Sequence, residues 1–292
     1  KSTSMICALI TTFIWGTAFI AQDTGMDNIG PLTFNFSRFL VGFITILPFA
    51  LIFEKKKIIS EISTKSKIFY KYLLFMGISL FLGTFLQQAA LQYTNIANAA
   101  FFTVFYVPLV PILLFLIYSN KVHWSIWPSI GLCILGVYLL SDFSNSEIML
   151  GDALVIICSI FWALHIIFAG KFMEIFDIPI FYAALQALFV ATLSFVFSYF
   201  FEEINFSNIL LESSSIIYAG VLSGGIAFTL QMFAQKNIEE TPAAIIYSLE
   251  GVFAAIAGWI ILDQFLNLSN IFGCFLILIA VIFSQLAPSS KN

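Results

Sequence analysis

Charge is scarce in this chain. Charged residues make up 10% of the 292 positions, whereas hydrophobic residues make up 61%. Soluble domains carry roughly 25% charged residues, so this composition excludes a water-soluble globular fold. The four cysteines lie in separate apolar stretches with neither CxxC spacing nor a cluster of metal-ligand residues. Cysteines in such surroundings are typical of small buried apolar side chains.

What the chain has in abundance is apolar sequence of membrane-spanning length. A helix needs about 20 apolar residues to cross the hydrocarbon core, and lipid-exposed backbone must satisfy its own hydrogen bonds, as a helix does. We therefore predict an all-α polytopic membrane protein with ten transmembrane helices and no separate soluble domain. The predicted spans are residues 5–22, 31–53, 71–93, 97–118, 125–142, 151–169, 179–200, 214–235, 242–262 and 270–287.

The lysines are sorted to one side of these spans. If the N-terminus is cytoplasmic and the chain crosses the membrane at every stretch, all eleven lysines fall on the cytoplasmic side or its edge, and the longest link, about 54–70, is a lysine-rich cytoplasmic segment. Short cytoplasmic loops carry excess Lys and Arg because translocating these charges is unfavourable. We therefore predict an integral protein of the bacterial cytoplasmic (inner) membrane with both termini in the cytoplasm. The lysines are Lys1, Lys55, Lys56, Lys57, Lys65, Lys67, Lys71, Lys121, Lys171, Lys236 and Lys291.

Carboxylates show the opposite preference, and no basic surface interleaved with aromatic residues points to nucleic acid as a partner. The expected partners are therefore the lipid bilayer and a small-molecule substrate. The carboxylates predicted on the outer side are Asp23, Asp27, Asp142, Glu147, Asp152, Glu202, Glu203, Glu212 and Asp263.

The chain also repeats itself. With an offset of 144, residues 86–109 overlay 230–253, and slightly larger offsets pair Trp15 with Trp162. Each half holds five spans, an odd number, so the second half must enter the membrane inverted relative to the first. We predict one repeat over residues 1–145 and a second over 146–292, with a binding site near the midplane between them, as in many secondary transporters.

Five short motifs spread over nearly the whole chain carry a family resemblance. They are Ile14-Trp15-Gly16, Phe36-Ser37-Arg38-Phe39, Leu91-Gln92-Tyr93-Thr94-Asn95, Phe161-Trp162-Ala163 and Leu249-Glu250-Gly251-Val252-Phe253. In these motifs the chain resembles the EamA-type transporters of the drug/metabolite transporter (DMT) superfamily. Gly251 and Asp263 stand where that family often has proline and glutamate. The resemblance implies ten helices in two inverted halves, a central cavity, alternating access and no cofactor. It leaves the substrate open, because members move amino acids, other metabolites, nucleotide sugars or drugs.

Away from the span ends, two charged residues lie well inside predicted spans, where such groups are costly and often functional. Glu250 lies in the ninth span, and its repeat partner is Tyr106. We expect both to face the central cavity, with Glu250 contacting substrate or a coupling proton; the alternative is a protonated or hydrogen-bonded structural carboxylate. Arg38, in the second span, would hold a carboxylate group or instead pair with Asn35, a backbone carbonyl or another carboxylate.

Other polar and aromatic side chains within the spans are weaker candidates for the transport path. His165 is either a neutral, satisfied membrane histidine or a proton relay. Gln87 and Gln231 are repeat equivalents that either line the path or hydrogen-bond between helices. Aromatic residues expected to form the cavity walls, or else to pack without a specific role, are Trp15, Trp162 and Tyr247.

Proline and glycine predict where helices bend or approach one another. Pro108 and Pro111 lie inside the fourth span and should kink or break it. Gly220 and Gly224, followed by Gly225, should let the eighth span approach a neighbouring helix closely.

Together these features predict a secondary transporter, an exporter of a small metabolite such as an amino acid, which works by alternating access. Glu250 would suit an amine and Arg38 a carboxylate, so both together suit a zwitterion. An alternative is transport of amines, quaternary ammonium compounds or hydrophobic drugs, and another class is a channel or a non-transporting receptor. An enzyme is not expected, because two distant histidines and one intramembrane carboxylate supply no catalytic cluster. Without a sodium-site motif, proton coupling and uncoupled facilitation are both open, and the sequence does not give the oligomeric state.

Overall fold

The computed structural model describes residues 2–94, 96–140, 150–261 and 265–287, which are helical with short links and contain no strand. The expected boundary between the two repeats, at 145/146, lies outside the described residues. So do Lys1, Lys291 and three of the carboxylates expected on the outer side, Asp142, Glu147 and Asp263.

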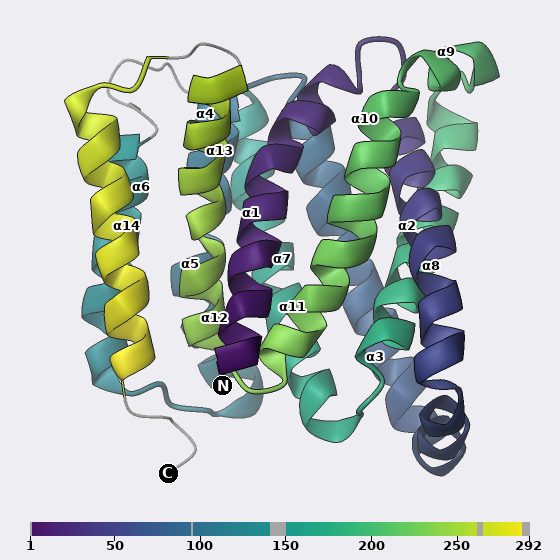
Figure 1. Cartoon of the computed structure of the whole chain (residues 1–292), viewed down its shortest axis with the longest axis horizontal. Coiled ribbons are helices and arrows are strands. Elements are labelled where there is room, and N and C mark those ends of the chain that lie inside the picture. The colour runs from purple at the N-terminus through teal and green to yellow at the C-terminus, as the bar shows by residue number, and fades with distance from the viewer. Residues whose placement is uncertain (1, 95, 141–149, 262–264, 288–292) are drawn as a thin grey trace.

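The first half of the chain forms six α-helices, of which α4 and α5 follow one another in the same direction (Figure 1). The short 3₁₀ turn η1 (Trp124–Ile126) leads into the sixth. The six helices are α1 (Ser2–Thr24), α2 (Pro31–Phe53), α3 (Lys55–Ala90), α4 (Ile96–Thr103), α5 (Tyr106–Tyr118) and α6 (Trp127–Leu140).

The second half begins with the long helices α7 and α8 and contains one π-helical stretch, η3. Within the described residues, nine helical segments are long and apolar enough to cross a membrane, and the apolar segment Trp124–Leu140 is shorter. The chain is therefore an all-α polytopic membrane protein, as predicted. The second-half elements are α7 (Leu150–Ile175), α8 (Pro179–Phe201), α9 (Phe206–Leu211), α10 (Ser213–Tyr218), η3 (Ala219–Ala227), α11 (Phe228–Gln235), α12 (Glu240–Tyr247), α13 (Leu249–Ile261) and α14 (Leu268–Leu286).

The two ends of the bundle differ in charge. We call the end that carries the start of α3 and the links 119–123, 176–178 and 236–239 the lysine end; it lies at the bottom of Figure 1. The opposite end, with the link 25–30 and Glu202, is called the acidic end. All the ion pairs among the described residues involve lysines at the lysine end.

The predicted lysine-rich link at 54–70 is helical. α3 begins at Lys55 and continues to Ala90, with one non-helical residue, Lys65 (φ −128°, ψ 32°). Residues 54–70 contain neither glycine nor proline, so nothing in the local sequence stops the helix before the kink.

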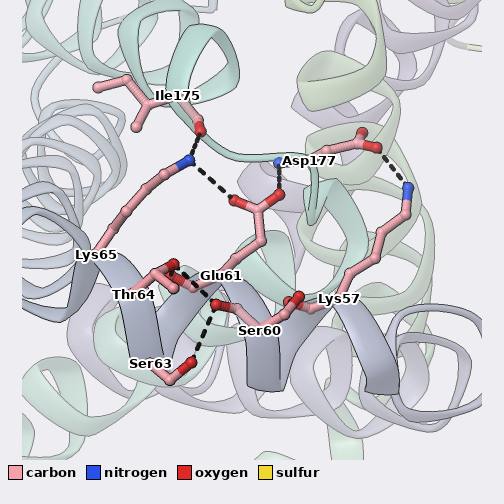
Figure 2. Close-up of polar contacts among 8 residues, drawn as sticks. All are labelled: Lys57, Ser60, Glu61, Ser63, Thr64, Lys65, Ile175 and Asp177. Carbon is pink, nitrogen blue, oxygen red and sulfur yellow. Dashed lines mark hydrogen bonds and ion pairs between the residues drawn. The ribbon is translucent and has the colours of Figure 1, made fainter.

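The start of α3 is held against the link between α7 and α8 (Figure 2). Lys57 pairs with Asp177, which also accepts a hydrogen bond from Lys236 at 2.5 Å. The Glu61 carboxylate accepts from the backbone N–H of Asp177 at 3.3 Å, and Lys65 donates to the carbonyl of Ile175 at 2.8 Å. Asp177 therefore ties α3 in the first half of the chain to two links in the second half.

α2 and α8 lie side by side and antiparallel, and each is capped by a carboxylate from the end of the other. Glu202, just after α8, accepts the backbone N–H groups of Leu32 and Thr33 in the first turn of α2, both at 2.8 Å. Glu54, just after α2, accepts N–H groups in the first turn of α8 at 3.1 and 2.8 Å. The first N–H groups of a helix have no partner within the helix, and a negative charge there is favoured by the helix dipole. These two caps fix both ends of the α2–α8 pair.

Glycines bring η3 against α2, as the sequence predicted. A Cβ on Gly220 would lie 2.7 Å from the carbonyl oxygen of Arg38 and 2.7 Å from Cβ of Val41, and a Cβ on Gly42 would lie 2.9 Å from the carbonyl carbon of Gly224. Side chains at these positions would force the two backbones apart.

The fourth span is broken, as its prolines predicted. α4 ends at Thr103 and α5 begins at Tyr106. Pro108 has no N–H to donate to the carbonyl of Val104; this carbonyl instead accepts from Val107 at 2.9 Å. The ninth span has a matching break at Ser248, between α12 and α13, although no proline lies there.

We expect Gly220→Ala to destabilise the protein by about 1–3 kcal/mol, because the added methyl group overpacks the backbone of α2. Gly131→Ala on α6 is the matched control, since a Cβ there meets nothing within 4 Å. The measurement is the midpoint of thermal unfolding of the two purified variants and of the wild type. An equal midpoint for all three would contradict the close packing of η3 against α2.

The ion pairs of Asp177 should make the stability of the fold depend on pH. Partial burial alone would raise its pKa, but the hydrogen bonds and charges of Lys236 and Lys57 outweigh burial and hold the pKa below its ordinary value of 3.8. The ionised carboxylate therefore stabilises the fold above pH 3.8, and this contribution disappears as the pH falls through the lowered pKa. Because these side chains are 39–55% exposed, we expect Asp177→Asn to cost at most about 1 kcal/mol. The difference in unfolding midpoint between variant and wild type should shrink with acidification; a growing difference would contradict the pairing.

Candidate functional site

A cavity lies in the interior of the bundle and has an empty volume of about 530 Å³, part of it open to solvent. We call it the central cavity. Its walls come from α1, α2, α3, α4, α5, α7, η3, α11, α12 and α13, and so from both halves of the chain. Eight of the nine residues singled out from the sequence line it: Trp15, Arg38, Gln87, Tyr106, Trp162, Gln231, Tyr247 and Glu250.

Glu250 and Tyr106 meet at the two helix breaks. Tyr106 is the first residue of α5, and Glu250 is the second residue of α13. The Tyr106 hydroxyl donates to Oε1 of Glu250 over 3.4 Å, a contact between residues 144 positions apart. This distance is long for an O–H···O hydrogen bond, whose usual range is about 2.5–3.0 Å, so the contact orients Glu250 only weakly. The carboxylate also lies in the first turn of α13, where the helix dipole favours negative charge.

Arg38 is held at one edge of its guanidinium. Its Nε donates to Oδ1 of Asn35 at 2.9 Å, and its Cζ lies 5.5 Å from the ring centre of Phe34 and 4.9 Å from that of Phe39, within cation–π range. The pairing with Asn35 is one of the alternatives that the sequence left open. Among the described residues, no carboxylate lies within ion-pair distance of Arg38. Its two Nη groups therefore have no charged partner in the described part of the chain.

Aromatic rings form a continuous wall. The rings of Trp15 and Trp162, which the repeat pairs, lie 6.3 Å apart between centres, and Trp15 also lies 5.5 Å from Tyr247. Trp162 and Phe228 are stacked with an interplanar angle of 7°. A wall of this kind offers π faces to a cation or to apolar groups.

The two glutamines differ in their hydrogen bonds. Gln87 donates to Oγ1 of Thr103 at 3.1 Å, and Gln231 donates to Oε1 of Gln235 at 3.1 Å. Oε1 of Gln231 and the hydroxyl of Tyr247 are buried and have no hydrogen-bond partner among the described residues. Buried polar atoms are normally paired, and because both residues line the central cavity, these two atoms are available to a ligand or water.

His165 lies behind the cavity wall. It is fully buried, its Nε2 is 3.0 Å from Oε1 of Gln186, and its ring packs edge-on against those of Trp162 and Phe228. It is therefore not among the residues that line the central cavity.

The cavity has further lining residues that the sequence did not single out. Most lie one or two helical turns from predicted ones: Phe19 and Gln22 follow Trp15 on α1, Thr84 precedes Gln87 on α3, and Thr103 precedes Tyr106. Residues three or four apart share a helix face, so this spacing would have found them from the sequence. Ile166, four residues after Trp162, and Phe228, three before Gln231, fit the same spacing, and the remaining lining residue is Ser223.

A polytopic helical protein with a polar, aromatic-walled cavity between its halves has the architecture of a membrane transporter. Comparison with known proteins agrees: the sequence matches the EamA-like transporter family over residues 2–142 and again over 149–286. The chain belongs to the EamA-like transporter family, within the drug/metabolite transporter superfamily, and is a membrane transporter.

Individual relatives cover nearly the full chain. A protein of Archaeoglobus fulgidus named "Uncharacterized transporter" is 31% identical over 95% of this chain and 84% of its own length. "Uncharacterized transporter YoaV" of Bacillus subtilis is 23% identical over 99% of this chain and 98% of its own. A solved crystal structure superposes with a TM-score of 0.78 at 14% identity, covering 98% of this chain and 97% of the other, which shows a shared fold.

Proposed function

We propose that this transporter exports a small zwitterionic metabolite, such as an amino acid, by alternating access between two inverted five-helix repeats. The observation that carries the proposal is that Arg38 and Glu250 line the same cavity without an ion pair between them. A buried charge without an opposite charge is costly. A zwitterion supplies both missing charges at once.

Each end of such a substrate has a matching group. The guanidinium group of Arg38 suits a carboxylate, which can accept two parallel N–H···O hydrogen bonds from it. An ammonium group suits Glu250 and the neighbouring aromatic faces of Trp15 and Tyr247. Because Arg38 has no second cation beside it among the described residues that line the central cavity, the site offers little to a phosphate-bearing substrate.

The alternative substrates use only part of this site. Amines and quaternary ammonium compounds need Glu250 and the aromatic wall but leave Arg38 without a partner. Hydrophobic drugs need the aromatic wall and leave both charges without one. A channel or a non-transporting receptor would not need the matched breaks in the fourth and ninth spans, which give each repeat a place to bend at the midplane.

For the direction and coupling of transport, we propose that the lysine end faces the cytoplasm, so that export runs from the lysine end to the acidic end. Glu250 is the group in the central cavity that can exchange a proton for a substrate amine, since it is the only carboxylate among the lining residues. The bacterial inner membrane is the proposed location.

The test is thermal stabilisation of the purified protein by a panel of amino acids, amines and quaternary ammonium compounds. At a concentration of about 100 times Kd, a bound ligand should raise the unfolding midpoint by about 5 °C or more. We expect an amino acid to do so in the wild type but not in Glu250→Gln or Arg38→Ala, because each variant lacks one of the two charges.

Glu203→Gln is the matched control, since Glu203 is an exposed carboxylate outside the cavity. It should respond like the wild type. Stabilisation by quaternary ammonium compounds that needs Glu250 but not Arg38 would replace the amino acid with a cation as substrate. Stabilisation that persists in both cavity variants would overturn the proposed site.

A further inference from the structure

We propose that the ion pair between Lys171 and Glu240 is the gate that closes the lysine end of the central cavity and separates during transport. This inference rests on the proposed alternating access, but it concerns residues outside the substrate site.

The pair lies between two spaces. At the lysine end lies a recess with an empty volume of about 1070 Å³, open solvent included. It is lined by the link 119–123, by the link residue Glu239 and by residues of α5, η1, α7 and α12, among them Lys171 and Glu240. On α7, Ile166 lines the central cavity and Lys171 lines the recess. Five residues of helix rise by about 7.5 Å. A barrier less than two turns thick therefore separates the two spaces along α7.

Buried side chains fill this barrier on the cavity side of the ion pair. Gln235 donates to the carbonyl of Ile166 at 2.7 Å, and Gln231 donates to Gln235 at 3.1 Å. Both glutamines are at most 4% exposed. These contacts join α11 to α7, and the ion pair joins α12 to α7 at the recess.

The ion pair requires a close approach of the two helices. Nζ of Lys171 lies 3.3 Å from Oε1 of Glu240, and the two side chains are 11% and 6% exposed. A Cβ on Gly170 would lie 2.7 Å from Cγ of Glu240. Glycine at position 170 therefore gives Glu240 the room it needs beside α7.

Lys171 also has a second partner, which makes the contact with Glu240 separable. Its ammonium group lies 3.1 Å from Oε1 of Glu174, three residues further along the same helix. Oε1 of Glu240 has no hydrogen bond beyond this ion pair among the described residues. When α7 and α12 move apart, Lys171 keeps Glu174, and water in the recess can solvate Glu240. Opening therefore leaves neither charge buried and alone, which is the costly outcome for an ion pair.

The test measures access to the cavity from the lysine end. In a background without the four native cysteines, Ile166→Cys reports on the cavity through its reaction with a membrane-impermeant maleimide. Membrane vesicles in which an exposed Ser60→Cys reacts identify the preparation whose lysine end faces the reagent. We expect Glu240→Gln to raise the labelling rate of the cysteine at position 166 at least tenfold, because the gate loses one of its charges.

Glu174→Gln is the matched control, since it removes the other partner of Lys171 without touching the contact between α7 and α12. Its labelling rate should equal that of the parent or be lower. The charge exchange Lys171→Glu with Glu240→Lys is made in the Glu174→Gln background, because a carboxylate at position 171 would otherwise face Glu174. It should return the rate to within about twofold of that background, and it tests the gate even where a single variant fails to fold.

Two results would overturn the gate: equal labelling of Glu240→Gln and its parent, or fast labelling of the charge exchange. Labelling needs no substrate, so its outcome is independent of the amino-acid proposal. A gate that responds as expected in a protein that binds no amino acid would leave the gate standing and remove the substrate assignment.

Discussion

The cost of placing charge in hydrocarbon is the constraint on which this structure depends. It places the lysines at one end of the bundle, where they pair with carboxylates such as Asp177 and Glu240. Among the described residues that line the central cavity, Arg38 and Glu250 are the charged ones. Charged residues inside a membrane usually have a function. Arg38 and Glu250 define the two ends of the proposed substrate site.

Helix ends do much of the positioning in this fold. The carboxylates of Glu54 and Glu202 cap opposite ends of the α2–α8 pair and hold two long helices in register across the halves of the chain. The interrupted spans place Tyr106 and Glu250 at the start of a half-helix. Polar groups of the central cavity are thereby presented by short, oriented segments.

The sequence predicted the helices well because their signal is local. The apolar runs predicted the membrane spans, and Pro108 predicted the break between α4 and α5. The repeat offset paired Tyr106 with Glu250 as equivalent positions, and in the structure the two side chains are in contact. The break at Ser248 was missed because no helix-breaking residue marks it. The helical start of α3 was missed because lysine-rich sequence was interpreted only as a link, although no glycine or proline interrupts it. The position of His165 behind the wall, and the contact of Lys171 with Glu240, depend on how distant helices rotate and pack, which a list of spans does not contain.

The most direct test of the central claim is counterflow of radiolabelled amino acids in proteoliposomes that contain the purified protein. A transporter with an alternating site predicts uptake that saturates and that is accelerated by the same unlabelled amino acid inside, with both properties lost in Glu250→Gln and retained in Glu203→Gln. Uptake that rises linearly with concentration, without acceleration by internal solute, would contradict alternating access and point to a channel. Absence of flux for every amino acid, with saturable flux of a quaternary ammonium compound, would contradict the zwitterion site.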